Sequence, residues 1–157
     1  MTELLDQLVL HEGLELLPYK DTLNIDTIGI GRNLEHRGLS EEELAHIGKD
    51  ISDICEWGIT KEQAYYLAEN DVKIVEKEVC EKHPCVLELD EVRQRVIIDM
   101  AFNMGVPRLN KFVKMWKAID EQDFSEAKVQ MLDSRWANQV GNRAVRLSNA
   151  MDTGEWV

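Results

Sequence analysis

The sequence is poor in positive charge. Its 157 residues contain 18 lysines and arginines against 30 aspartates and glutamates, which gives a formal net charge of −12. Binding to nucleic acid depends on a cationic surface that neutralises phosphates, and adhesion to anionic lipid has the same requirement. The composition therefore argues against nucleic acid as a partner and against tight binding to an anionic membrane.

Long apolar runs are also missing. The first residues, MTELLDQLVLHEGLELL, are interrupted by Asp6, His11 and Glu12, so they predict neither a secretory signal nor a membrane-inserted helix. If the target lies outside the cytosol, we expect another protein to provide the exit.

Cysteine and histidine are scarce, and none of them shows the spacing of a metal site. The chain has Cys55, Cys80 and Cys85, and its internal histidines include His36, His46 and His83. An odd cysteine count indicates reduced thiols in a protein made in the cytosol, although a Cys80–Cys85 disulfide stays open. We expect surface or packing roles for the histidines and no metal site.

Capping signals and apolar spacing predict a small sheet among helices. Leucines at helical spacing predict a helix over residues 3–12, and short β-type runs follow from Tyr19 to Leu34. Ser40 with Glu43 predicts a helix start. A second capping box at residues 60–63 predicts a helix to about residue 82, about 33 Å long.

The rest of the chain is expected to be helical. Apolar stripes run from Val92 to Met104 and from Phe112 to Ile119, and Asp123 with Glu126 gives another cap signal. A last helix is expected around 143–151, closed by Gly154. The fold class is therefore α+β. We expect one domain with a small α/β lobe (13–58), a helical lobe (60–157) on which helix 3–12 packs, and a cleft at their junction.

The stretch HEGLELLPYKDTLNIDTIGIGRNL brings together three residues that suit glycoside hydrolysis. Such a reaction needs an acid to protonate the leaving oxygen and a carboxylate to activate water or attack the sugar. Glu12 and Asp21 provide these types, and the hydroxyl of Thr27 can hold a water. The spacing alone adds little, because a glutamate at a helix end is usually a solvated or capping carboxylate.

The same stretch resembles the phage-type lysozymes, or endolysins, of glycoside hydrolase family 24, in particular the T-even phage lysozyme type. The shared pattern is Glu, nine positions to Asp, six more to Thr, then Ile-Gly-Ile-Gly. Three later motifs agree in order and spacing: RQRVIIDMAFNMG (93–105), SRWANQVGNRAVR (134–146) and TGEW (153–156). The resemblance thus covers nearly the whole chain and implies a lysozyme-like fold.

The resemblance implies a muramidase that cuts peptidoglycan between N-acetylmuramic acid and N-acetylglucosamine. It places Glu12 as general acid, Asp21 as the second carboxylate and Thr27 beside the attacking water. Members of this type look inverting, with Asp21 as base. No cofactor is implied, because acid–base hydrolysis of a glycoside needs none.

Five further residues match family positions in the helical lobe. The resemblance implies that Arg143 pairs with the catalytic Glu and that Phe102, Asn103 and, more weakly, Gln130 contact sugar and peptide. Trp136 matches a family tryptophan. For Phe102 and Trp136, plain core packing is the alternative.

Two departures from the family pattern matter. Arg32 stands where the best-known family member has an ion-pairing histidine, so the sequence does not establish a pair there. The acidic net charge removes general attraction to the anionic wall, which leads us to expect activity that prefers higher salt or divalent cations.

Three competing interpretations remain open at this stage. A glycosidase acting on chitin or chitosan would use the same acids, a lytic transglycosylase would not need Asp21, and a wall-binding protein would need none of the three. We expect a monomer. The lack of a predicted secretory signal fits a protein that accumulates in the cytoplasm of an infected host, depends on a holin-type membrane protein for release, and then acts on the periplasmic wall.

Overall fold

The computed structural model describes residues 1–156. The chain divides into two compact units, the first spanning Met1–Val72 and the second beginning at Lys73. One long helix, α4 (Lys61–Lys82), starts in the first unit and ends in the second. Its start is capped as predicted, because Gln63 N donates to Thr60 Oγ1 and Thr60 N donates to Gln63 Oε1.

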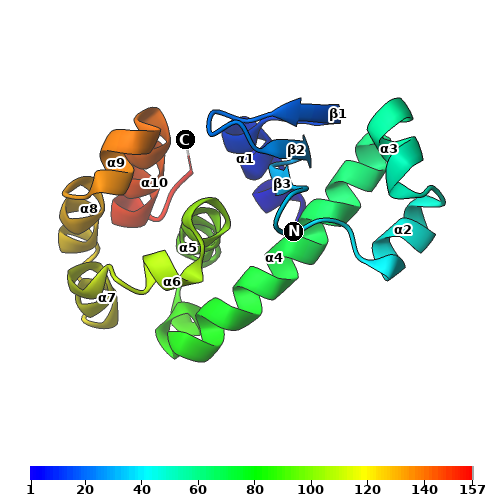
Figure 1. Ribbon diagram of the computed structural model, residues 1–157. Coiled ribbons are helices and arrows are strands. Elements are labelled where there is room, and N and C mark those ends of the chain that lie inside the picture. The colour runs from blue at the N-terminus through cyan, green and yellow to red at the C-terminus, as the bar shows by residue number, and fades with distance from the viewer. Residues whose placement is uncertain (157) are drawn as a thin grey trace. The chain divides into compact units, whose positions relative to one another are not determined.

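The first unit combines three strands with short helices (Figure 1). Its elements before α4 are α1 (Thr2–Glu12), β1 (Glu15–Lys20), β2 (Asp26–Gly29), β3 (Arg32–Asn33), α2 (Glu41–Ile47) and α3 (Ile51–Trp57). The strands form one antiparallel sheet in the order β1-β2-β3. The α+β class predicted from the sequence is thereby confirmed.

Strand β1 begins earlier than expected. The sequence predicts strands only from Tyr19 because Pro18 interrupts the pattern, yet Pro18 lies inside β1. The strand is at the edge of the sheet, and its register is irregular between Glu15 and Tyr19. An edge strand with an irregular register tolerates a residue that has no backbone N–H to donate.

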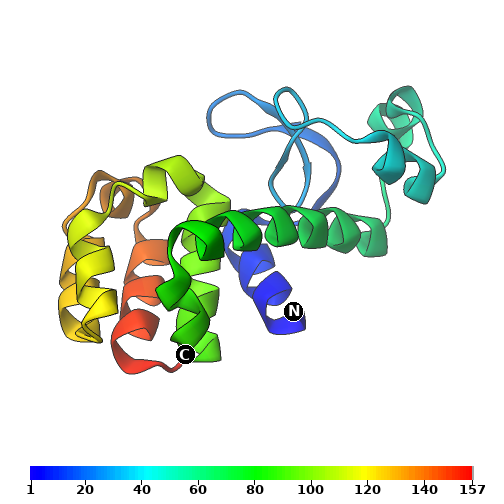
Figure 2. The same ribbon diagram turned by 90° about the horizontal axis from the view of Figure 1, so that it is seen from below.

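A small apolar core joins the sheet to the helices of the first unit. Ile28 of β2 packs with Ile47 of α2, Ile54 of α3 and Leu67 of α4, all of which are buried. Figure 2 shows α2 and α3 beside the start of α4. The glycine between α3 and α4, Gly58, ends α3.

An ionic cluster lies beside this core. Arg32 of β3 is 2% exposed and forms ion pairs with Glu43 and Asp71, each at 2.8 Å. Glu43 also completes the predicted capping box with Ser40. Arg32 therefore does form ion pairs, with a partner on α2 and another on α4.

The second unit is helical throughout its described part. After α4 come a 3₁₀ turn (Pro84–Glu88), α5 (Glu91–Met104), α6 (Val106–Leu109), α7 (Val113–Asp120), α8 (Phe124–Leu132), α9 (Arg135–Val140) and α10 (Asn142–Thr153). Helix α5 buries every side chain from Val96 to Ala101, and α8 and α10 pack together (Figure 1). The predicted cap at Asp123 is confirmed, as is the end of the last helix at Gly154.

No helix within residues 1–156 is long and apolar enough to cross a membrane. The predicted lobe bounds and the packing of helix 3–12 on the helical lobe stay predictions.

Candidate active site

Glu12 is the last residue of α1 and is half-buried. Its side chain packs over Gly31 in the turn between β2 and β3: a methyl group built on Gly31 would lie 3.1 Å from Glu12 Oε2 and 3.3 Å from its carboxyl carbon. Gly31 has a φ of +70°, which favours glycine. The turn therefore brings bare backbone against the carboxylate, and any larger residue would displace it.

Asp21 follows β1 and is held by the turn that leads into β2. Its Oδ1 accepts hydrogen bonds from Leu23 N at 2.8 Å and Ile25 N at 2.9 Å. The backbone of the turn is closed by Asp21 N donating to Ile25 O and by Asn24, which has a φ of +63°. Because both backbone donors bind Oδ1, the second oxygen, Oδ2, can face a water or a substrate.

Thr27 lies on β2 opposite Tyr19 of β1 and Asn33 of β3, and it is 4% exposed. Its hydroxyl donates to Ile25 O at 2.9 Å. The hydroxyl proton is thereby used, so Oγ1 can only accept from a further partner. A water beside Thr27 would have to donate a hydrogen bond to Oγ1. The lone pairs of that water would then point away from Thr27.

The phenol of Tyr19 is close enough to both Glu12 and Asp21 to be affected by their charges. Partial burial raises the pKa of its phenol, and the charges of Glu12, Glu15 and Asp21 raise it further. Both predicted catalytic carboxylates thus act on the same phenol group, which pairs across the sheet with Thr27. The first unit contains Glu12, Asp21 and Thr27 within one local arrangement of α1, the β1–β2 turn and β2.

The predicted substrate-binding residues lie in the second unit. Asn103, next to half-buried Phe102 on α5, accepts a 2.7 Å hydrogen bond from the indole N–H of Trp136. Trp136 is 1% exposed and meets the ring of Phe112 edge-on at 6.3 Å. Gln130 on α8 donates to Glu126 at 2.7 Å. Trp136 is therefore a core residue that also fixes the side chain of Asn103.

Arg143 on α10 has a partner that the sequence argument missed. Its Nε donates to Asp99 Oδ1 at 2.9 Å, and Asp99 on α5 is completely buried. The sequence contained a signal for this pair: Asp99 is the charged residue in the apolar run VIIDMAF, and a buried carboxylate requires a partner. The predicted pairing of Arg143 with Glu12 stays a prediction.

A pocket of about 440 Å³ opens in the second unit. Helices α7, α8 and α9 and the segment before α7 contribute its lining, which is Arg108, Lys111, Phe112, Val113, Lys114, Gln130, Asp133, Ser134, Arg135 and Trp136. Of the predicted site residues it contains Gln130 and Trp136. Three of its cations, Arg108, Lys111 and Lys114, lie three residues apart along the chain, and Arg135 comes from α9.

The cysteines form no disulfide, and two of the histidines stack on aromatic rings. All three thiols are free, and burial together with a hydrogen bond to Asp120 raises the pKa of Cys85 to about 11. His46 stacks on Tyr66 and His83 on Trp116, at 3.7 and 3.6 Å between ring centroids. Within the described residues no group of three or more acids, histidines or cysteines could hold a metal ion.

An α+β chain that holds two carboxylates and a hydroxyl together in this way has the features of a glycoside hydrolase. The family model for phage lysozyme matches residues 9–150. The chain belongs to the phage lysozyme family. It is accordingly a glycoside hydrolase of the muramidase class whose substrate is peptidoglycan.

The chain is also similar in sequence to individual proteins, two of which are named as lysozymes. The chain is 33% identical over 160 residues to the probable T4-type lysozyme 1 of Dictyostelium discoideum, covering 95% of this chain and 93% of the relative. It is 29% identical to the probable T4-type lysozyme 2 of the same organism, covering 98% and 96%. It is also 31% identical to the pre-baseplate central spike protein Gp5 of Enterobacteria phage T4, covering 91% of this chain and 26% of that protein.

Proposed function

We propose that this enzyme hydrolyses the β-1,4 bond between N-acetylmuramic acid and N-acetylglucosamine by direct displacement with water. Glu12 donates a proton to the leaving glycosidic oxygen, and Asp21 accepts a proton from the attacking water. Thr27 positions that water. An inverting reaction of this kind needs one acid and one base on opposite sides of the bond.

The observation that carries this proposal is the local set formed by α1, the β1–β2 turn and β2. The carboxylate of Glu12 lies close to Gly31, and Asp21 is held by two backbone hydrogen bonds to a single oxygen. Rigid placement of the reacting groups contributes much of the rate in an acid–base reaction.

The hydrogen-bonding capacities of Thr27 and Asp21 support an orientation for the attacking water. Thr27 Oγ1 has given its proton to Ile25 O, so it accepts one proton of the water. Asp21 Oδ2 accepts the other proton as the oxygen attacks the anomeric carbon. Two acceptors on the two protons aim a lone pair of the water at the sugar, and the proton transferred to Asp21 leaves a neutral carboxyl.

The rest of the substrate would lie along residues of the second unit. We propose that Phe102, Asn103 and Gln130 contact sugar and peptide and that Arg143 pairs with Glu12 in the active enzyme. The bond from Trp136 to Asn103 fixes the amide so that it presents its N–H₂ group as a donor.

We further propose the role of an endolysin. The protein would accumulate as a monomer in the cytoplasm of an infected host, reach the periplasmic wall through a lesion made by a holin-type membrane protein, and release the phage. The phage lysozyme family supports an enzyme that hydrolyses peptidoglycan, and two relatives named probable T4-type lysozymes come from Dictyostelium discoideum.

The test is hydrolysis of purified Gram-negative sacculi by the wild type and by Glu12→Gln, Asp21→Asn and Thr27→Val. Each change keeps the side-chain shape, and the amide oxygen that Asp21→Asn introduces can still accept the two backbone hydrogen bonds. We expect Glu12→Gln and Asp21→Asn to lose at least about a hundredfold in kcat with unchanged thermal unfolding, and Thr27→Val to lose less.

The chain ends of the products separate the alternatives. Reducing muramic acid ends, with the α-anomer formed first, support the proposed reaction. Anhydro ends would identify a transglycosylase and remove the role of Asp21, and β-anomers would make Asp21 a nucleophile. Wall binding without any hydrolysis by the wild type would overturn the enzymatic proposal altogether.

A further inference from the structure

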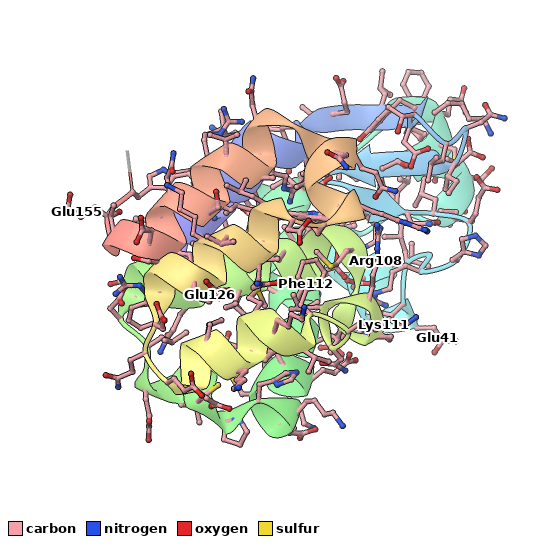
Figure 3. The ribbon with its side chains drawn as sticks, turned by 90° about the vertical axis from the view of Figure 1, so that its left-hand side faces the viewer. Glu41, Arg108, Lys111, Phe112, Glu126 and Glu155 are labelled. Atoms are coloured by element: carbon pink, nitrogen blue, oxygen red, sulfur yellow. The ribbon has the colours of Figure 1, made fainter. Side chains whose placement is uncertain are left out.

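The two units differ strongly in charge. Residues 1–72 contain 16 acidic and 5 basic side chains, a formal charge of −11, whereas residues 73–157 contain 14 and 13, a formal charge of −1. Exposed cations of the second unit include Arg108 and Lys111, which lie along the segment before α7 (Figure 3). Nearly all of the net charge of −12 therefore belongs to the first unit, which attracts cations.

A groove of about 660 Å³ opens within this first unit. The start of α1, the last turn of α2 and the first half of α4 provide its lining. The lining does not include Glu12, Asp21 or Thr27, and Glu12 lies at the other end of α1. The groove is therefore separate from the proposed catalytic residues.

Two tyrosines give the groove an aromatic surface. Tyr65 and Tyr66 are neighbours on α4, and both are half-buried. The phenol of Tyr65 donates a hydrogen bond to Asp6 Oδ1 at 3.3 Å, and the ring of Tyr66 stacks on His46 with 3.7 Å between centroids. The two rings are thus held by contacts to α1 and α2, so a ligand would meet a preformed surface.

Carboxylates surround these rings. Asp6, Glu62 and Glu69 belong to the lining, and Lys61 is the one lysine or arginine among its described residues. Glu62 and Glu69 share a face of α4 with Tyr65, three positions before it and four after it. The ammonium of Lys61 lies 5.7 Å from the centre of the Tyr65 ring. This ring therefore already has a cation over its face, which is how aromatic side chains bind ammonium groups.

We propose that this groove is an accessory binding site for glycan strands whose glucosamine units lack the acetyl group and carry a free ammonium. The proposal rests on the proposed function, because it takes a glycan strand as the substrate. The ammonium would pair with Glu62 or Glu69, the sugar hydroxyls would donate to the carboxylates, and the ring would pack on the tyrosines. An acetylated unit offers a neutral amide in place of the cation.

The size and the charge of the groove favour this ligand. A volume of about 660 Å³ is more than one small ammonium ion fills, so the ligand is expected to be extended. The surplus of carboxylates excludes the anionic parts of the wall. Units with a free amine are the cationic points of an otherwise anionic glycan, and the acidic first unit would bind the wall through them.

Nuclear magnetic resonance measures this binding and locates the ligand. The full ¹⁵N-labelled chain carrying Glu12→Gln, which should leave the probe intact, is titrated with a glucosamine tetramer at about pH 7 and about 50 mM salt. An N-acetylglucosamine tetramer is the neutral comparison. We expect the glucosamine tetramer to shift the signals of the groove lining and to bind there at least about tenfold more tightly than the acetylated tetramer.

Three variants of the groove test the contacts. Glu62→Gln removes a carboxylate and Tyr65→Leu removes an aromatic face, and each should weaken the binding by about twofold to fivefold. Lys61→Gln removes the cation that competes for the Tyr65 ring, so the affinity should rise about twofold. A damaged fold cannot explain a tighter complex, which keeps the test independent of stability.

Glu78→Gln is the matched control. It removes the same charge as Glu62→Gln from an exposed position on α4 that does not line the groove, and it should leave the affinity unchanged. On sacculi whose glucosamine units have been deacetylated, active Glu62→Gln enzyme should show a higher KM and an unchanged kcat. Its activity on fully acetylated sacculi should equal that of the wild type.

Four results would overturn the proposal: equal binding of the two tetramers in the groove, shifts confined to the surroundings of Glu12 and Asp21, an equal effect of Glu78→Gln, or binding of spermidine as tight as that of the glucosamine tetramer. The last result would make the groove a general polyamine site. A wild type that binds the glucosamine tetramer in the groove but hydrolyses no wall would keep the groove and reject the proposed function.

Discussion

The buried guanidinium of Arg32 uses all its donors. It makes five hydrogen bonds, and their acceptors are the carboxylates of Glu43 and Asp71 and the carbonyls of Gly38 and Leu67. A buried charge of this kind destabilises a fold unless it is fully paired. Burial alone would raise the pKa of Glu43, but the hydrogen bonds from Arg32, Asn70 and Ser40 outweigh it and lower the pKa to about 2.

This depressed pKa predicts how stability depends on pH. Glu43 binds a proton near pH 4.5 in the unfolded chain but only near pH 2 in the folded one, so its stabilisation is complete above pH 4.5 and is lost as the pH falls toward 2. Between about pH 6 and about pH 3 we expect this group to remove about 2 kcal/mol from the free energy of unfolding. Urea titrations at the two pH values measure the loss.

Glu43→Gln and Glu42→Gln separate this effect from general acid destabilisation. Glu42 lies one position earlier on α2 and is exposed. Glu43→Gln should cost about 3 kcal/mol at about pH 6, because Arg32 keeps only one charged partner, and should lose about 2 kcal/mol less than the wild type on acidification. An acid-dependent loss that is the same in the wild type and both variants would contradict the assignment to Glu43.

At the scale of elements, the approach of α3 to β1 depends on Gly58. A methyl group on Gly58 would collide with Leu16 O, which accepts a hydrogen bond from Ile59 N at 2.9 Å. Gly58 has φ +76° and ψ −164°, a region that is nearly closed to other residues. We expect Gly58→Ala to lower the free energy of unfolding by about 3 kcal/mol through strain and backbone displacement.

Gly48→Ala is the comparison for this prediction. Gly48 ends α2 in the left-handed helical region, with φ +78° and ψ 22°, and an added methyl group would meet nothing within 4 Å. It should cost only about 1 kcal/mol. Equal losses for the two variants, measured by urea unfolding, would show that the contact with β1 is not what makes Gly58 necessary.

Element boundaries with local causes were predictable from the sequence. The capping boxes at Ser40 and Thr60 and the stop at Gly154 are signals within a few residues, and all three are confirmed. The early start of β1 was missed because an edge position in a sheet, which makes Pro18 acceptable, is not visible locally.

The candidate site likewise contains residues that the local sequence could predict and residues that it could not. Glu12, Asp21 and Thr27 lie close together in the chain, so one sequence motif could contain them. Asp99 with Arg143, and Arg135 with the pocket cations of residues 108–114, are brought together only by tertiary packing. Their sequence separations leave no pattern, and only the unexplained charge in the core of α5 indicated one of them.

At the scale of the whole molecule, the net charge of −12 governs the approach to the wall. The wall is itself anionic, so the overall field repels it, whereas the cations that line the pocket of the second unit attract it locally. Repulsion between extended surfaces acts over tens of ångströms at low salt, where the screening length is about 30 Å at about 0.01 M and about 8 Å at about 0.15 M. Salt should therefore weaken the long-range repulsion before it weakens pairing in the pocket.

We expect the hydrolysis of purified sacculi to accelerate severalfold between about 0.01 and about 0.15 M sodium chloride, and to do so at lower concentrations of magnesium chloride. Sacculi with amidated stems are the matched substrate: their lower charge reduces the repulsion, so the same change in salt should alter the rate less. A rate that falls steadily from low to physiological salt would mean that the cationic pocket, rather than the acidic remainder of the surface, controls the encounter with the wall.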